Sequence, residues 1–311
     1  MSEEKLVETK ISEFWGQSTP LEERKLVAWM EHPRVIRHIN KRTTGDETLT
    51  WFSYIGNKYF QNSVNRALSI GCGEGGLERH ALAQGMVELF DAIDISQGAI
   101  EKAQQAAKKA GFLQRVNYSV SDLNQLTLTP NFYDAVFASM SIHHIEALEL
   151  VFEQISQALR TGRYFIFNEY VGPNRFQLPE ERITLINDTL KILPSRFRRF
   201  IQNGIVTPQV KIYHKNPPLL WFEENDPSEA VRSADILPVL EKFFEIIEFK
   251  PYGGSLLQFM LQDIVGNFTD GEDDDDAWLD MVMYFEKVLE ETGVIQSDFV
   301  LVVAVPKHHS F

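Results

Sequence analysis

The spacing of apolar residues changes along the chain and divides it into three parts. Up to residue 62, apolar positions recur at helical spacing, as in 46–60, which predicts a group of N-terminal helices. From 64 to 171, short apolar runs alternate with amphipathic stretches, a pattern typical of strands separated by helices. After residue 172 helical spacing dominates, and only 243–254 and 299–306 contain further strand-like runs.

Five strand-like segments lie in the middle part, with crossovers between them. Consecutive strands joined in this way form a parallel sheet with helices on both faces, so the pattern predicts an α/β core. The five segments are 66–71, 87–95, 115–122, 133–141 and 163–171.

Composition excludes several classes of protein. The 311 residues are 44% hydrophobic and 24% charged, which excludes disordered and collagen-like chains. The net charge of −14 disfavours binding to nucleic acid or to an anionic membrane surface. The single cysteine excludes an intramolecular disulfide, and no apolar run reaches about 18 residues. We therefore expect a cytoplasmic protein without a signal peptide or a membrane span.

The glycine-rich turn after the first strand is the first motif with chemical meaning. In LSIGCGEGGLE, four glycines (Gly71, Gly73, Gly75 and Gly76) stand between a strand and a helix. Glycines let a ligand approach the backbone, and the start of the helix offers unpaired N–H groups. The spacing fits the G-x-G-x-G of S-adenosylmethionine sites and the G-x-G-x-x-G of dinucleotide sites. The loop therefore leaves both cofactors open, and a tight turn without a ligand is the third alternative.

Polar and small residues follow the next three strands. Asp94 ends the second strand, where a carboxylate can accept hydrogen bonds from both ribose hydroxyls. The alternative is a cap for the next helix, a role that Ser96 could also fill. Asp122, after the third strand, can accept the exocyclic amine of adenine or simply close a turn. The small residues Ser139–Ser141 leave room for a ligand after the fourth strand.

This order of strands, helices and motifs resembles that of the class I S-adenosylmethionine-dependent methyltransferases of the small-molecule type. The resemblance covers residues 64–171 and the last two strands. The resemblance implies a seven-stranded, mostly parallel, Rossmann-like sheet with an antiparallel last strand. It also implies S-adenosyl-L-methionine, bound across the C-terminal edge of the strands. The residues that the resemblance places on this cofactor are Gly71, Cys72, Gly73 and Glu74 in the loop, Asp94 and Ile95 at the ribose and adenine, Asp122 and Leu123 at the adenine edge, and Ser139 and Met140 beside the methionine part.

One departure from the family and one alternative enzyme class bear on this resemblance. Many members carry an acidic residue two positions before the first glycine, where this chain has Ser69, and Glu74 is the candidate to compensate. Short-chain dehydrogenases use a Tyr-x-x-x-Lys pair after the fourth or fifth strand. The only such pair here, Tyr54 and Lys58, precedes the glycine loop, so the order disfavours nicotinamide chemistry.

Three residues at the predicted C-terminal edge could act as a base. Methyl transfer from a sulfonium is an in-line displacement, so the enzyme aligns the nucleophile and removes its proton when it has one. The candidates are His143, His144 and Glu169. A packed, hydrogen-bonded histidine and a salt-bridged loop carboxylate are the structural alternatives. A carboxylic acid acceptor would need no base, because it is ionised at pH 7.

The remaining segments are expected to form a helical cap over the sheet edge. The predicted division is an N-terminal helical cap 1–62, a cofactor-binding core 63–172 and 243–311, and helical cap insertions 173–242 and 252–298. The insertions are rich in Leu, Met, Phe and Trp, which favours an enclosed pocket of about 300–1,000 Å³ for an apolar or aromatic acceptor. Ordinary core packing and a homodimer interface are the other uses of such a surface.

Charge is segregated in the last third of the chain. Residues 191–215 contain six basic and no acidic side chains, whereas 221–298 contain 20 acidic and four basic ones. The basic segment could receive an anionic group of the acceptor or pair with the acidic segment. No His/Cys cluster has the spacing of metal ligands, so no metal is expected.

The sequence therefore predicts a methyltransferase that moves the methyl group of S-adenosyl-L-methionine to an oxygen or nitrogen of a small metabolite of specialised or cell-surface metabolism. Two alternatives stay open. One is a peptide, protein or glycan as the acceptor, and the other is a cofactor-binding partner protein without catalysis.

Overall fold

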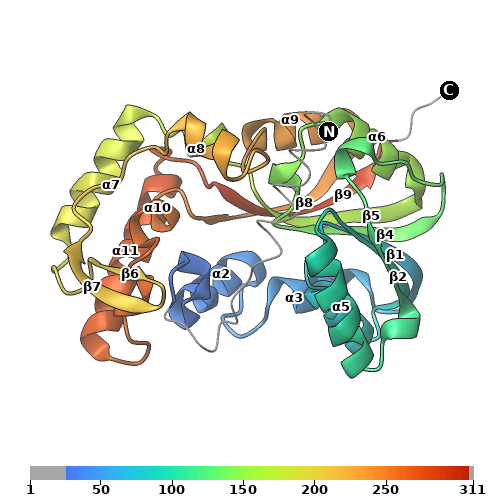
Figure 1. Ribbon diagram of the computed structural model, residues 1–311, viewed down its shortest axis with the longest axis horizontal. Coiled ribbons are helices and arrows are strands. Elements are labelled where there is room, and N and C mark those ends of the chain that lie inside the picture. The colour runs from blue at the N-terminus through green and yellow to red at the C-terminus, as the bar shows by residue number, and fades with distance from the viewer. Residues whose placement is uncertain (1–25, 308–311) are drawn as a thin grey trace.

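A central sheet organises the computed structural model, which describes residues 26–307 (Figure 1). The strand order is β3-β2-β1-β4-β5-β9-β8. Strands β1 to β5 pair in parallel, and β9 is antiparallel to both β5 and β8. The predicted seven-stranded, mostly parallel, Rossmann-like sheet with an antiparallel last strand is confirmed. The strands are β1 Val64–Ile70, β2 Val87–Asp94, β3 Val116–Val120, β4 Tyr133–Ser139, β5 Leu159–Tyr170, β8 Phe244–Gly253 and β9 Phe299–Pro306.

The order of the strands reverses beside β1. This strand lies between β2 and β4. Strands β2 and β3 follow one another on one side of β1, and β4 and β5 follow one another on its other side. At such a switch point the helices that follow the two neighbouring strands lie on opposite faces of the sheet, which leaves a crevice at the C-terminal edge. The glycine loop follows β1, and the Ser139–Ser141 turn follows β4, so both border this crevice.

Helices cover both faces of the sheet, which explains why its central strands are continuous apolar runs. Strand β4 is buried at six of its seven positions. In Figure 1, α6 and α9 lie above the sheet, and α3 and α5 lie below it. The covering helices are α6 Leu148–Ala158 and α9 Ile236–Phe243 on one face, and α3 Trp51–Tyr59, α4 Gly76–Ala83 and α5 Gln97–Lys109 on the other.

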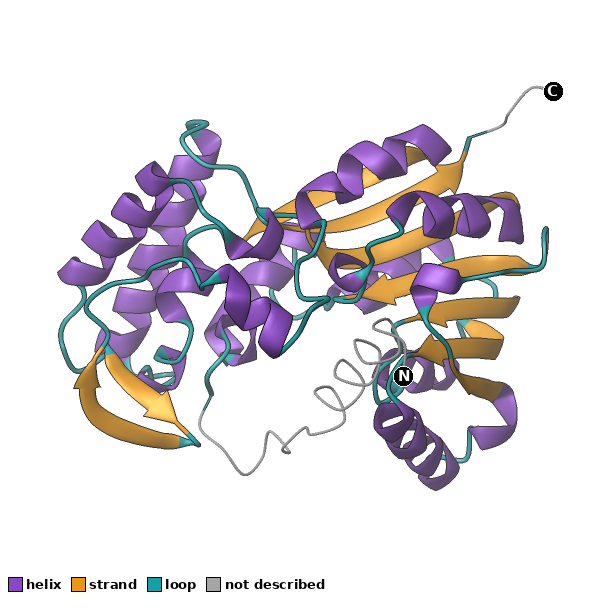
Figure 2. Ribbon diagram, turned by 45° about the horizontal axis from the view of Figure 1, so that its top comes forward, coloured by secondary structure: helices purple, strands orange, loops and turns teal. Residues whose placement is uncertain are grey.

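A second group of elements forms a cap with its own apolar core. This core holds Trp29, Leu190, Phe197 and Leu279, and it reaches the sheet through Phe299 at the start of β9. Figure 2 shows the helical cap beside the strand-rich core, with the β6–β7 hairpin at the outer edge of the cap. The cap elements are α2 Pro33–Thr44, α7 Glu180–Ile192, β6 Arg199–Gln202, β7 Ile205–Val210, α8 Leu219–Glu224, α10 Leu257–Leu261 and α11 Asp273–Glu291.

The N-terminal helices of the sequence prediction divide between the cap and the core. Helix α2 packs in the cap, whereas α3 packs on the sheet, where Phe52 and Ile55 are buried. The helices expected before residue 26 lie outside the described residues. None of the helices between residues 26 and 307 is both long and apolar enough to cross a membrane.

The first insertion is not wholly helical, contrary to expectation. Strands β6 and β7 form an antiparallel hairpin. Asn203 and Gly204 at its tip both have positive φ, at 50° and 74°. This Asn-Gly pair suits a tight hairpin turn, so the sequence carried a signal for the hairpin.

The second insertion, expected to be helical, is interrupted within 255–268, because tertiary hydrogen bonds replace helical ones there. The N–H of Asp263 donates to the carbonyl of Val27 (2.8 Å), and its carbonyl accepts from the N–H of Ile201 (2.7 Å). The helical segments that remain are α10 and the short 3₁₀ turn Val265–Asn267.

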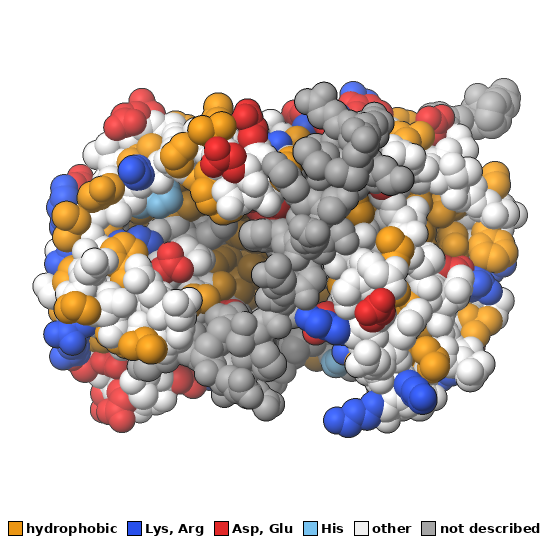
Figure 3. Space-filling view, viewed as in Figure 1, with side chains coloured by type: hydrophobic (Ala, Val, Ile, Leu, Met, Phe, Trp, Pro, Cys, Tyr) orange, Lys and Arg blue, Asp and Glu red, His pale blue; other side chains and the backbone are white. Residues whose placement is uncertain are grey.

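An acidic run forms the first turn of the last helix of the cap. Asp273–Asp276 open α11, where negative charge interacts favourably with the helix dipole. Asp274 pairs with Arg196 of the basic segment, and Asp276 pairs with Arg34 of α2. Acidic side chains gather at this lower end of the cap in Figure 3.

Glu286 of α11 is a buried carboxylate that joins the cap to the end of β8. It accepts hydrogen bonds from the backbone N–H groups of Gly254 (3.0 Å), Leu256 (2.7 Å) and Leu257 (3.0 Å). Burial raises its pKa to about 7. Because the pKa is raised in the folded state, its contribution to stability is fully present below the ordinary pKa of 4.5 and is lost as the pH rises through about 7.

We expect Glu286→Gln to remove this pH dependence. Between pH 4.5 and 8 the unaltered chain should lose up to about 3 kcal/mol of unfolding free energy relative to the variant, since each pKa unit corresponds to about 1.4 kcal/mol. Urea unfolding at pH 5, 6, 7 and 8 measures the difference. Glu291→Gln, on an exposed position of the same helix, is the control. Parallel pH curves for the unaltered chain and Glu286→Gln would contradict the prediction.

Candidate active site

The glycine loop is built around a close approach to the loop after β4. Gly71 has a φ of +62°, and a Cβ atom added there would lie 2.3 Å from Cβ of Ser141. Both the backbone conformation and the lack of space therefore require glycine. The N–H of Cys72 donates to the carbonyl of Ile93 (3.0 Å), which ties the loop to β2.

Asp94 holds the other side of the same loop. Its Oδ2 accepts from the N–H of Gly73 (2.8 Å), and its Oδ1 accepts from the N–H of Ser96 (2.8 Å). Burial raises the pKa of this carboxyl group. Ser96 caps α5 by accepting from the N–H of Ala99 (3.2 Å), so the capping role belongs to the serine. Asp94 thus stands at the end of β2 with its carboxylate against the glycine loop.

The remaining residues predicted to bind the cofactor lie after β3 and β4. Asp122 accepts from the backbone N–H of Asn124 (2.9 Å) and fixes the short 3₁₀ helix that begins at Leu123. Met140 has a φ of +54°, and its N–H donates to the carbonyl of Asn168 (2.8 Å). Since β1 to β4 are parallel, the ten predicted cofactor residues all lie at one edge of the sheet.

Glu169 of β5 organises the loop that carries both histidines. Its Oε2 accepts from the N–H groups of Ser141 (2.8 Å) and Ile142 (2.6 Å), and its Oε1 accepts from the N–H of Tyr170 (2.7 Å). Oε1 also lies 2.5 Å from Nδ1 of His143. The side chain of Glu169 is fully buried, so its contacts position the loop and the His143 ring.

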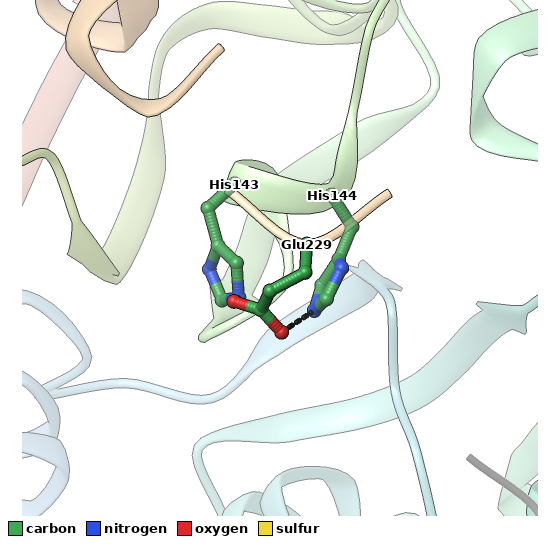
Figure 4. Close-up of side chains that lie close together, drawn as sticks. All are labelled: His143, His144 and Glu229. Carbon is green, nitrogen blue, oxygen red and sulfur yellow. Dashed lines mark ion pairs between the residues drawn. The ribbon is translucent and has the colours of Figure 1, made fainter. Parts of the chain in front are cut away.

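His143, His144 and Glu229 meet at this edge, and Figure 4 shows both rings directed toward the carboxylate. Nε2 of His143 is 3.6 Å from Oε1 of Glu229, and Nε2 of His144 is 4.0 Å from Oε2. Sequence reasoning found the two histidines and missed Glu229. That residue comes from the segment before the short 3₁₀ helix Ser233–Asp235 in the cap, and no motif marks it.

The two rings differ in their electrostatic surroundings. Burial by itself lowers the pKa of His143, but the carboxylates of Glu169, Glu229 and Asp226 outweigh it and raise the pKa to about 9. Burial, together with the positive charges of His143 and Arg175, lowers the pKa of His144 well below its usual value. Burial also raises the pKa of Glu229, against the opposing effect of His143.

A pocket of about 600 Å³ opens in the cap between α10 and the segment after β7. Phe176 forms part of its wall, and the Phe176 ring packs 5.0 Å from that of Tyr170, centroid to centroid. The Tyr170 ring in turn lies 6.4 Å from that of His143. The other apolar and aromatic lining residues are Phe200, Val210, Ile212, Tyr213, Pro217 and Phe259.

Residues 68–167 match the family model of a methyltransferase domain, and this span contains the glycine loop, Asp94, Asp122 and both histidines. This span is therefore a methyltransferase domain of the class I S-adenosylmethionine-dependent type. The match bears out S-adenosylmethionine, rather than a nicotinamide dinucleotide, as the cofactor to which the loop is suited.

Individual methyltransferases resemble this one over the same region. The sterol 24-C-methyltransferase of Candida albicans is 27% identical over 128 residues, which are 41% of this chain and 34% of that protein. The 27-O-demethylrifamycin SV methyltransferase of Amycolatopsis mediterranei is 29% identical over 38% of this chain and 44% of its own length. The chain therefore spans less than half the length of these curated relatives.

A solved structure agrees with the fold over nearly the whole chain. The geranyl diphosphate C-methyltransferase of Streptomyces coelicolor superposes with a TM-score of 0.50 and 10% identity, over 97% of this chain and 98% of that one. At this identity the likeness concerns the fold alone.

Glu78, which sequence reasoning missed, lies where this methyltransferase departs from its family. Its carboxyl group comes from α4, is fully buried beside the Ser69 side chain, and has its pKa raised to about 7 by burial. Glu74, the residue predicted to compensate for Ser69, is exposed and pairs with Lys102 (3.1 Å). Of the two glutamates, Glu78 is therefore the one whose carboxyl group lies against Ser69.

We expect Asp94→Ala to weaken binding of S-adenosylhomocysteine. Loss of one charge-assisted hydrogen bond costs roughly 1.5–3 kcal/mol, which corresponds to about a 10- to 150-fold rise in Kd by calorimetry. Glu88→Ala, an exposed acidic position on the same strand, is the control. A Kd for Asp94→Ala within twofold of the unaltered value would contradict the prediction.

Glu78→Gln should weaken the binding of S-adenosylhomocysteine roughly tenfold, or about 1.4 kcal/mol. The physical reason is that a buried carboxylate beside the loop favours the positive charge of the ligand's ammonium group. An analogue that lacks the amino group should bind both forms equally. Glu74→Gln is the matched control, and a larger effect for that variant than for Glu78→Gln would assign the compensating role to Glu74.

Proposed function

We propose that this chain transfers the methyl group of S-adenosyl-L-methionine to an oxygen or nitrogen of a small, apolar or aromatic molecule. The observation that carries the proposal is the glycine loop at the β1/β4 switch point, held by Asp94 within the span of the methyltransferase domain. We propose that the ten residues named from the sequence bind this cofactor. The first of them is Gly71 in the glycine loop, and the last is Met140 after β4.

The cap pocket supports a small acceptor. A volume of about 600 Å³ suits a molecule of ordinary metabolite size, and most of the lining is apolar or aromatic. Phe176, in the wall of the pocket, packs on Tyr170, whose ring lies beside that of His143, so these two packed side chains separate the pocket from the histidines. The relatives named for a sterol, a demethylmenaquinone and a demethylrifamycin also favour a small molecule over a polymer.

The proposed catalytic residues are His143, His144 and Glu169. His143 and His144 stand on one short 3₁₀ helix at the end of β4, where the acceptor's reacting atom would meet the methyl group. Glu169 acts through its bonds to the loop and to His143, so its proposed role is to position the histidines. Together these residues align the nucleophile, and His144, which its lowered pKa keeps neutral, is the one that can receive its proton.

Two experiments test the proposed function. Calorimetry with S-adenosylhomocysteine and with NAD should detect only the first ligand, and tight binding of NAD alone would overturn the proposal. Incubation of the protein with methyl-labelled cofactor and cell extract should then label a small molecule. A labelled protein or polysaccharide would redirect the assignment to a polymer acceptor, and binding without any labelled product would favour a non-catalytic partner protein.

We expect His143→Ala and His144→Ala each to lower turnover by about 10²–10⁴, the usual contribution of a positioned acid or base. Glu169→Gln should lower turnover as well, because it removes one of the bonds that orient the loop. The measurement is kcat with the labelled acceptor at saturating cofactor, after calorimetry has shown that cofactor binding is intact. If all three variants kept turnover within about threefold, proton removal by this site would be the wrong mechanism.

A further inference from the structure

The cluster of His143, His144 and Glu229 has the composition of a metal site. One ligand atom from each side chain lies within 4.8 Å of the others. In a tetrahedral site with bonds of roughly 2.0–2.1 Å, ligand atoms lie about 3.3–3.4 Å apart. Nε2 of His143 is 3.6 Å from Oε1 of Glu229 and Nε2 of His144 is 4.0 Å from Oε2, so the three side chains would have to draw closer together around the ion.

Each imidazole is also supported on its far side, as metal-bound histidines are. Nδ1 of His143 lies 2.5 Å from Oε1 of Glu169. Nδ1 of His144 lies 3.0 Å from Oγ of Ser228, whose own hydroxyl donates to Asp226 (2.6 Å). In each ring Nδ1 therefore carries the hydrogen, and Nε2 faces Glu229. Such outer partners orient metal-binding histidines and fix their tautomer.

The charges around the cluster favour a divalent cation. Three carboxylates gather there, and two of them, Glu169 and Asp226, are fully buried. Arg175 is the nearby guanidinium, and it donates to the backbone carbonyls of Glu229 and Pro227. A divalent ion bound by two neutral histidines would balance the three carboxylates together with Arg175.

We propose that Nε2 of His143, Nε2 of His144 and the carboxylate of Glu229 bind a divalent transition-metal ion of the Zn²⁺ type. Two imidazoles and one carboxylate form a known ligand set for zinc sites that keep a position open for another ligand. The site revises the expectation of no metal, which considered only ligand spacing along the sequence. Binding of the ion does not depend on the proposed function. Its role in methyl transfer does rest on that function: with both Nε2 atoms on the ion the histidines could not accept a proton, and the ion would instead polarise an acceptor oxygen.

Spectroscopy on the full chain without a polyhistidine tag tests the site. Because His308 and His309 could bind metal by themselves, the reference protein carries His308→Ala and His309→Ala. Added Co²⁺ should give visible absorption bands of a four- or five-coordinate ion at one equivalent, and Zn²⁺ should displace it. If saturating Co²⁺ gave no such bands, the proposal would be overturned. In this measurement His143, His144 and Glu229 are unaltered, so the result does not depend on whether a variant folds.

Variants assign the ligands. His144→Ala and Glu229→Gln should each weaken Zn²⁺ binding at least tenfold by calorimetry, and Glu169→Gln should do so by about 10- to 100-fold through the His143 ring. His80→Ala, an exposed histidine on α4, should have no effect. Unchanged affinity in folded Glu229→Gln and His144→Ala proteins would overturn the assignment. S-adenosylhomocysteine binding is measured on the same samples: if it is retained while metal binding is absent, only the metal site fails.

Discussion

The contact between the glycine loop and the loop after β4 is the constraint on which the whole site depends. These loops leave neighbouring strands at the switch point, and they touch because Gly71 has no Cβ atom to meet Ser141. The Ser141 hydroxyl donates to the carbonyl of Ile70 (2.9 Å), and its N–H donates to Glu169. A single contact therefore sets the distance between the cofactor loop and the histidines. A side chain at Gly71 would disturb both at once.

Buried carboxylates hold this arrangement together, and each is balanced by donors rather than left alone. Asp94 accepts from two backbone N–H groups at the glycine loop, Glu169 from three at the ends of β4 and β5, and Glu286 from three where the cap meets β8. An unpaired charge in such positions would cost several kcal/mol, so these bonds make the local backbone conformation strongly preferred. A further carboxylate, that of Glu229, joins Glu169 beside His143.

The cap contributes to the site as well as covering it. Glu229 and Phe176 both come from the first insertion. The carboxylate of Glu229 lies beside the His143 ring, whereas the Phe176 ring packs on Tyr170, which in turn lies beside His143. The first insertion thus supplies both part of the wall of the cap pocket and a polar group beside the histidines.

The sequence alone determined the sheet, its covering helices and the residues at the strand ends, because apolar spacing and glycine positions act over short stretches of chain. Gly71, Asp94, His143 and Glu169 were found in this way. Tertiary structure decided the rest. Glu229 lies 86 positions after His143, and the Asp263 bond to Val27 that breaks a predicted helix joins segments more than 200 residues apart. Such pairings depend on how the cap packs against the sheet, and no local pattern encodes which distant side chains that packing brings together.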